Sequence, residues 1–150
     1  MEIKPYTAER IDDVIAFELQ LRKEESFWGW EIDDAYVDAV KKSFQDSRFV
    51  HSVSLLAYRE GKVVGRIDSS LICSHFDGSV KAYLDWICVL KSERHVSVAQ
   101  ALLDALRNTL RTMYGVDTLI ALMAQNEEAQ RFYRRVERAL IRDEGIWMDC

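Results

Sequence analysis

The sequence has little proline and no long apolar run. Pro5 is its one proline and its six glycines are scattered, so no linker divides the chain, and we expect a single domain over residues 1–150. No stretch approaches the ~20 apolar residues that cross a bilayer, and residues 1–13 lack the apolar segment of a signal peptide. We therefore expect a soluble, cytoplasmic protein that does not act on membranes.

Cysteine and basic runs are also scarce. The three cysteines are an odd number without CxxC spacing, and the three histidines show no metal-ligand spacing, so reduced thiols and no metal site are predicted. The net charge is −5, and no basic run is longer than the two residues of Arg134–Arg135, which argues against nucleic acid as a partner. A Gly-x-Ser-x-Gly elbow and a Walker-type loop are also missing.

The acidic residues gather in the first third of the chain. Residues 1–47 hold 12 Asp or Glu against 6 Lys or Arg, whereas residues 48–150 hold 13 against 14. Two acidic pairs flank an aromatic stretch; the residues are Glu24, Glu25, Phe27, Trp28, Trp30, Asp33 and Asp34. Carboxylates and aromatic faces attract cations, so this stretch is predicted to line a site for a cationic, partly apolar ligand. A solvated loop with helix-capping acids is the alternative.

Hydrophobic spacing and turn signals predict a mixed α/β (α+β) chain with the order β, α, α, β, β, β, α, β, α, β and a last short strand allowed. The expected ranges are a strand at 1–6, a helix capped by Thr7, a helix from Asp33 or Asp34 to 45–47, strands at 48–58, 62–73 and 81–90, a helix from Val98 to Met113 ended by Gly115, a strand at 117–123, a helix from 127 to about 137, and a hairpin at 140–148. Glu60–Gly61 is the expected hairpin turn. Strands 81–90 and 117–123 should be parallel, because a helix connects them.

The segment 91–99 carries site chemistry. Ser97 is predicted to cap the helix that starts at Val98, with Gln100 completing a capping box. Arg94 precedes this helix start and supplies a fixed positive charge, and small residues such as Ala99 allow a close approach. A phosphate group is therefore the predicted ligand, and a well-capped core helix is the alternative.

The order of elements and three segments together resemble the GNAT acetyltransferases. Residues 94–99, Arg-His-Val-Ser-Val-Ala, resemble the family's cofactor motif Arg/Gln-x-x-Gly-x-Gly/Ala, with Ser97 at its first glycine and His95 at the glycine common after the arginine. Residues 126–133 resemble the family's Asn-x-x-Ala-x-x-x-Tyr, although Glu137–Arg138 replaces its usual Gly-Phe sequel. Residues 64–67 match the Val-Gly-x-Ile strand of the family.

The resemblance implies a GNAT fold, which is a mixed, mostly antiparallel twisted sheet with helices on both faces, and acetyl-CoA as acyl donor. It implies that the bulged end of the fourth strand offers N–H groups to the thioester oxygen, that Asn126 follows the cofactor arm and that Tyr133 lies near the sulfur. The implied cofactor-binding residues are Cys88, Val89, Leu90, Arg94, His95, Val96, Ser97, Val98, Ala99, Asn126, Ala129 and Tyr133.

Two residues are the candidate catalytic acid and base. Asp85 is expected to take the proton of the amine, directly or through water, because two-residue alternation places it on the strand face of Tyr83 and Ile87. A strand-edge salt bridge is the alternative for Asp85. Tyr133 is the candidate acid, with a core tyrosine as the alternative. Cys88 fits a small hydrophobic residue of a strand better than a nucleophile.

Two functions remain open from the sequence. The first is an N-acetyltransferase that moves the acetyl group of acetyl-CoA to a primary amine, on a cationic small molecule or peptide, by direct attack in a ternary complex. Its predicted acceptor-binding residues are Glu24, Glu25, Phe27, Trp28 and Trp30. The second is a GNAT-fold module that binds acyl-CoA or a partner with little or no turnover. A homodimer is compatible with both.

Overall fold

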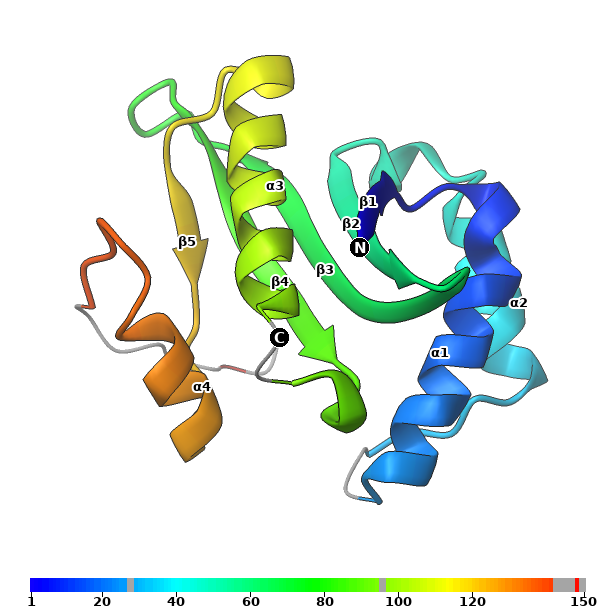
Figure 1. The fold of residues 1–150 in the computed structure, drawn as a ribbon. Helices are drawn as coiled ribbons and strands as arrows, with labels where there is room; N and C mark the ends of the chain where they lie inside the picture. The colour runs from blue at the N-terminus through cyan, green and yellow to red at the C-terminus, as the bar shows by residue number, and fades with distance from the viewer. Residues whose placement is uncertain (27–28, 95–96, 142–147, 149–150) are drawn as a thin grey trace. The chain divides into compact units, whose positions relative to one another are not determined.

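The computed structural model describes residues 1–26, 29–94, 97–141 and 148. Backbone contacts group the chain into two compact units, Met1–Ile120 and Ala121–Cys150. The described elements are β1 (Glu2–Pro5), η1 (Ala8–Arg10), α1 (Ile11–Glu24), α2 (Asp34–Ser43), η2 (Ser47–Phe49), β2 (Ser52–Arg59), β3 (Lys62–Cys73), β4 (Val80–Val89), η3 (Lys91–Glu93), α3 (Val98–Tyr114), β5 (Leu119–Ala121) and α4 (Glu127–Tyr133). This order confirms the predicted α/β class through α4 (Figure 1).

The strands of the described residues form one sheet in the order β1-β2-β3-β4-β5. The pairs β1–β2, β2–β3 and β3–β4 are antiparallel. Strand β5 lies beside β4, where Ala82 N donates to Thr118 O at 2.9 Å, and the arrows of β4 and β5 point the same way in Figure 1. The sheet is thus mixed and mostly antiparallel.

The β2–β3 hairpin shows how local residue chemistry sets an element's bounds. Glu60 and Gly61 both adopt positive φ, 50° and 76°, which a two-residue turn with the right-handed twist of a hairpin requires. Strand β3 starts at Lys62 as predicted. Strand β2, predicted from residue 48, starts only at Ser52, because Asp46 accepts a hydrogen bond from Arg48 N and begins a 3-10 turn.

Helices α1 and α3 cover opposite faces of the sheet. Neighbouring strand residues point to opposite faces. On β3, a Cβ at Gly65 would lie only 2.9 Å from Val98 Cγ1 of α3, whereas Arg66 Nη1 donates to Glu18 Oε1 of α1 at 3.3 Å. Gly65 therefore lets α3 approach the sheet closely, and Arg66 faces the α1 side.

The core of the first unit lies between the sheet and these two helices. Its fully buried side chains include Val14, Leu21, Leu56, Ile67, Leu102, Leu106 and Leu110. The helix predicted from Val98 is thus confirmed as a helix that buries apolar side chains, and Gly115 ends α3 in the left-handed region with φ 64°.

Several predicted ranges were too long. The strand predicted at 117–123 covers only Leu119–Ala121, and the helix predicted to about 137 ends at Tyr133. In the second unit Asn126 caps α4 by accepting a hydrogen bond from Ala129 N at 2.8 Å. The hairpin predicted at 140–148 lies mostly outside the described residues.

Candidate functional site

The loop after β4 is tied to distant parts of the first unit. Arg94 forms a two-pronged ion pair with Glu25 at the end of α1, with Nη1 donating to Oε1 at 3.0 Å and Nη2 to Oε2 at 2.5 Å. Ser92 donates to the Glu24 carboxylate from its N–H at 3.0 Å and its hydroxyl at 2.9 Å. Glu93 accepts a hydrogen bond from Arg59 at the end of β2. We call these three contacts together the η3 clasp.

The η3 clasp gives both residues of the first acidic pair, Glu24 and Glu25, a partner within the chain. Burial would raise the pKa of Glu24, but hydrogen bonds from Gln20 and Ser92 outweigh burial and lower it. The Glu25 side chain is only 9% exposed and faces Arg94. Both carboxylates, predicted to bind an acceptor, therefore already have partners within the chain.

The start of α3 differs from the predicted capping box. Ser97 adopts the left-handed conformation, with φ 64°, and its side chain makes no capping hydrogen bond. Gln100 Nε2 donates instead to Asp104 Oδ1 at 3.0 Å. The capping box was wrong, because a capping residue needs extended backbone angles that Ser97 does not have. His95 and Val96 lie outside the described residues.

Val98 and Ala99 open α3 directly after Ser97. Val98 is buried against Gly65, and Ala99 is half-buried. The first N–H groups of a helix have no acceptor within it, and Ser97 supplies none from its side chain. Together with Arg94, this helix start offers donors and positive charge to an anion.

The end of β4 is buried. Cys88, Val89 and Leu90 are each less than 9% exposed. Leu90 N donates to Val64 O at 3.0 Å, and Arg94 Nε donates to Val89 O at 3.4 Å. Burial, and then the charge of nearby carboxylates, raise the pKa of the Cys88 thiol to about 12. The thiol therefore stays protonated at neutral pH, which does not suit a nucleophile.

A β-bulge interrupts β4 at Asp85. Asp68 pairs with Trp86, but the next residue, Ser69, pairs with Leu84, so Asp85 has no cross-strand partner. The bulge lies earlier on β4 than residues 88–90, where the resemblance placed it. The Asp85 side chain is exposed.

The bulge also corrects the predicted face of Ile87. Ile87 pairs with Ile67, and Leu84 pairs with Ser69. Ile67 and Ser69 are two residues apart on β3, so they lie on the same face of the sheet, and this face is the α3 side on which Gly65 lies. Tyr83 pairs with Ser70 and so lies on the α1 side, while Ile87 points to the α3 side. The prediction that Tyr83, Asp85 and Ile87 all share one face was wrong, because alternation does not continue across a bulge.

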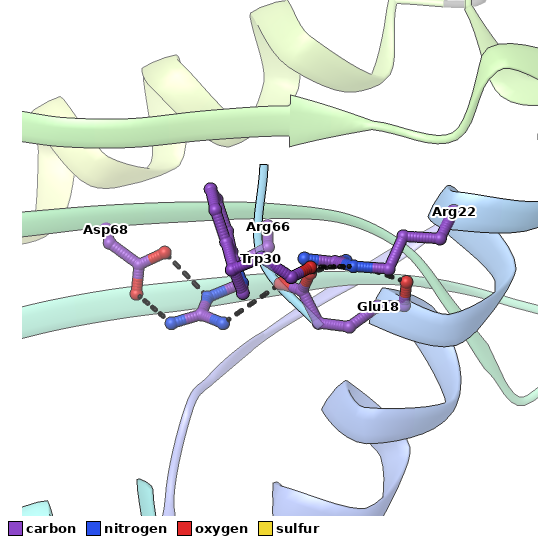
Figure 2. A network of polar contacts seen from close by, with 5 residues as sticks. All are labelled: Glu18, Arg22, Trp30, Arg66 and Asp68. Atoms are coloured by element: carbon purple, nitrogen blue, oxygen red, sulfur yellow. Dashed lines mark hydrogen bonds and ion pairs between the residues drawn. The ribbon is translucent and has the colours of Figure 1, made fainter. Parts of the chain in front are cut away.

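A buried charge network lies on the α1 side of β3. Figure 2 shows the Glu18 carboxylate between the guanidinium groups of Arg22 and Arg66, with Asp68 beyond Arg66. Arg22 Nη1 lies 2.7 Å from Glu18 Oε2, Arg66 Nη1 lies 3.3 Å from Glu18 Oε1, and Arg66 Nε lies 2.6 Å from Asp68 Oδ2. Burial would lower the pKa of Arg66, but the carboxylate of Asp68 outweighs it and raises the pKa. The network holds its charges by mutual pairing.

An aromatic pair, Trp30 and Trp86, lies next to Arg22 of this network. Arg22 Nε donates to Trp30 O at 3.0 Å, and the Arg22 guanidinium lies 5.1 Å from the centre of the Trp30 ring (Figure 2). Trp30 packs edge to face against Trp86 of β4, with ring centres 5.6 Å apart. Trp30 is 43% exposed. Phe27 and Trp28 lie outside the described residues.

The remaining predicted residues belong to the second unit. The Asn126 side chain caps α4 through Ala129 N, and the Tyr133 ring packs edge to face on Phe132 at 5.2 Å.

Among the described residues no group of three or more His, Cys, Asp or Glu could hold a metal ion. None of the described helices has both the length and the apolar character needed to span a membrane.

The sequence profile of the Acetyltransferase (GNAT) family matches residues 4–137. The chain belongs to the GNAT acetyltransferase family. Curated protein sequences give no significant match. At the position of the first motif glycine of the GNAT pattern, this member has Ser97 in a left-handed conformation, which glycine adopts at lower cost.

Three solved structures similar to this GNAT chain are each below 25% identical to it, so the likeness is one of fold. An aminoglycoside acetyltransferase from an uncultured soil metagenomic sample, in complex with trehalose, matches with TM-score 0.80 and 16% identity over 99% of this chain and 95% of that one. The ribosomal-protein-alanine N-acetyltransferase of Brucella melitensis biovar Abortus 2308 matches with TM-score 0.74 and 17% identity over 99% and 100%. AAC(6')-Iy, in complex with the bisubstrate analog CoA-S-monomethyl-acetylneamine, matches with TM-score 0.76 and 20% identity over 99% and 97%.

Sequence reasoning missed most of the residues that form the charge network, the aromatic pair and the η3 clasp of this GNAT chain. The missed residues include Glu18, Arg22, Arg66, Asp68, Trp86 and Ser92. Glu18 and Arg22 are four apart on a helix, and Arg66 and Asp68 are two apart on a strand face, so each pair carried a local signal of contact. The contacts that join the pairs link distant parts of the chain and have no local signal.

Proposed function

We propose that this GNAT protein transfers the acetyl group of acetyl-CoA to a primary amine on a cationic small molecule or peptide, by direct attack in a ternary complex. Family membership supports acetyl transfer. The aminoglycoside and ribosomal-protein-alanine acetyltransferases among the similar folds support an amine acceptor.

The start of α3 is the observation that carries the donor assignment. Arg94, with its fixed charge, precedes a 17-residue helix whose first N–H groups donate no hydrogen bond to the Ser97 side chain. A diphosphate is the group of acetyl-CoA that matches such donors, since helix N-termini and guanidinium groups both favour phosphate oxygens. Gly65 supports this arrangement, because without a Cβ at this position Val98 can pack directly on β3 and hold the start of α3 close to the sheet.

The acceptor would bind on the α1 side of β4. Asp85 is exposed next to Trp86, which pairs with Asp68 on the α1 side, and Trp86 packs on the partly exposed Trp30. A carboxylate and indole faces suit a cationic amine, because the first offers charge and the second cation-π attraction.

The reaction needs a neutral amine and a stabilised leaving group. Acetyl-CoA supplies a thioester, whose carbonyl carbon the amine nitrogen attacks as the C–S bond breaks. Asp85 would take the amine proton, directly or through water, and Tyr133 would give a proton to the departing thiolate. Backbone N–H groups near the end of β4 would stabilise the charge on the carbonyl oxygen.

A binding module with little turnover is the second candidate, and two observations favour it. Glu25 already occupies Arg94, and Ser97 stands where the GNAT motif has glycine. The test is a thiol-release assay with acetyl-CoA and a panel of polyamines, aminoglycosides, amino acids and N-terminal peptides. Turnover with a cationic amine supports the enzyme, whereas acetyl-CoA binding without release of CoA for any amine supports the module.

Tyr133→Phe and Asp85→Asn test the two roles. We expect each variant to lower kcat by at least about 100-fold while leaving the Kd of acetyl-CoA nearly unchanged, because proton transfer acts in the transition state. Phe132→Leu, next to Tyr133, is the control for packing. Unchanged kcat in either catalytic variant removes that residue from the mechanism.

A further inference from the structure

The Glu25–Arg94 contact is nearly enclosed by the protein. The side chains of Glu25 and Arg94 are 9% and 20% exposed, and both guanidinium Nη atoms donate to the carboxylate. The third guanidinium nitrogen, Nε, donates to Val89 O at 3.4 Å. All three nitrogens of Arg94 are thus engaged within the chain.

A diphosphate bound at the start of α3 would compete with the Glu25 carboxylate for the guanidinium group of Arg94. Arg94 cannot present its Nη atoms to phosphate in the same two-pronged geometry while Glu25 holds both of them. A move of Arg94 would also leave the Glu25 carboxylate without its partner in a site that is largely closed to water, which is unfavourable unless another cation replaces Arg94.

The rest of the η3 clasp allows such a change to stay local. Glu24 holds Ser92 through its N–H and hydroxyl, and Arg59 holds Glu93. These contacts hold η3 itself, through Ser92 and Glu93, independently of Arg94. The Arg94 side chain can therefore change partner without release of the loop from α1 and β2.

We propose that the diphosphate of the donor displaces Glu25 from Arg94, and that the released Glu25 carboxylate then binds the cationic acceptor. This inference rests on the proposed function. Glu25 thereby sets the affinity for the donor and makes acceptor binding depend on it, because an anion that takes Arg94 and a cation that replaces it favour each other's binding. No covalent bond is made or broken; the Glu25–Arg94 ion pair is replaced by two, between Arg94 and the diphosphate and between Glu25 and the acceptor.

The first test measures CoA binding by calorimetry without an acceptor. We expect Glu25→Gln to lower the Kd of CoA by about five-fold or more, because the competitor of Arg94 loses its charge. Arg94→Ala should remove this gain, so that Arg94→Ala/Glu25→Gln binds CoA no more tightly than Arg94→Ala. Circular dichroism confirms that each variant is folded.

Two matched variants separate competition from other effects. Asp46→Asn removes the same charge from a carboxylate that also holds an arginine, the exposed Arg48, and should leave the Kd of CoA within about two-fold. Glu24→Gln loosens Ser92 but keeps the Glu25–Arg94 pair. A gain in Glu24→Gln as large as in Glu25→Gln overturns the exchange, because loop release alone would then explain it.

An unchanged or higher Kd in Glu25→Gln also overturns the exchange and makes Glu25 a support that positions Arg94. Failure of the proposed function looks different: without a donor site the wild type and all variants would fail to bind CoA, and a module without turnover would release no CoA in the thiol-release assay with any amine.

The acceptor step is tested with sisomicin and spermidine as probes. Each amine is titrated into the wild type and into Glu25→Gln, with and without saturating CoA. We expect CoA to tighten binding of at least one amine about five-fold or more in the wild type and by less than about two-fold in Glu25→Gln. Absence of tightening for both amines in the wild type overturns the acceptor step.

Discussion

Glu18→Ala should strongly destabilise the protein. The Glu18 side chain is 2% exposed and lies between Arg22 and Arg66, each 17% exposed. Its removal leaves two largely buried guanidinium groups with only Asp68 as an anionic partner in this network, and breaking a buried ion pair costs about 3–5 kcal/mol. For a chain of 150 residues, at about 2–4 °C per kcal/mol, Tm should fall by roughly 6–20 °C.

Urea unfolding, followed by far-UV circular dichroism, measures the loss. Glu18→Gln keeps an oxygen acceptor but loses the charge, so we expect a smaller loss than in Glu18→Ala. Asp46→Asn is the surface control, because its partner Arg48 is 84% exposed and such pairs contribute about 0–1 kcal/mol. A loss below about 1 kcal/mol in Glu18→Ala would refute the role of buried charge pairing at this site.

Three further substitutions test single features of the first unit. Gly65→Ala should lower the free energy of unfolding by about 1–3 kcal/mol in urea, because its Cβ would press on Val98 at 2.9 Å. Ser97→Gly should raise the free energy of unfolding by about 1 kcal/mol by relieving the left-handed backbone, and no capping bond is lost. Burial, followed by the hydrogen bond to Asp13, raises the pKa of Tyr58 to about 12 from 10.0, so stability should fall as pH rises from 10 to 12 and fall less in Tyr58→Phe.

Local chemistry made much of the fold predictable. The β2–β3 turn, the start of β3 at Lys62 and the end of α3 before Gly115 all follow from residues within a few positions of each boundary. The same holds for the Asp33 cap of α2, which accepts a hydrogen bond from Tyr36 N at 2.8 Å. Such features need no knowledge of distant contacts.

Features that depend on pairing between distant segments were not predictable in this way. The bulge at Asp85 exists only in the register between β3 and β4, so alternation along β4 alone gave the wrong face for Ile87. Ser97 shows a related limit, because its residue type suits a helix cap while its backbone is left-handed. The family motif carried that information, since it has a glycine at this position.

The acidic surplus of residues 1–47 shows why a charge count overstates what a ligand can meet. Glu18 and Glu25 lie in ion pairs with arginines of β3 and the β4–α3 loop, Glu24 holds Ser92, and Asp33 caps α2. These carboxylates serve the fold first, so screening of a general acidic surface is not what should control acceptor binding. Each carboxylate can bind a ligand only after its partner in the chain has moved away. The affinity for a cationic acceptor should therefore depend more on whether the Glu25–Arg94 ion pair is closed than on the net charge of residues 1–47.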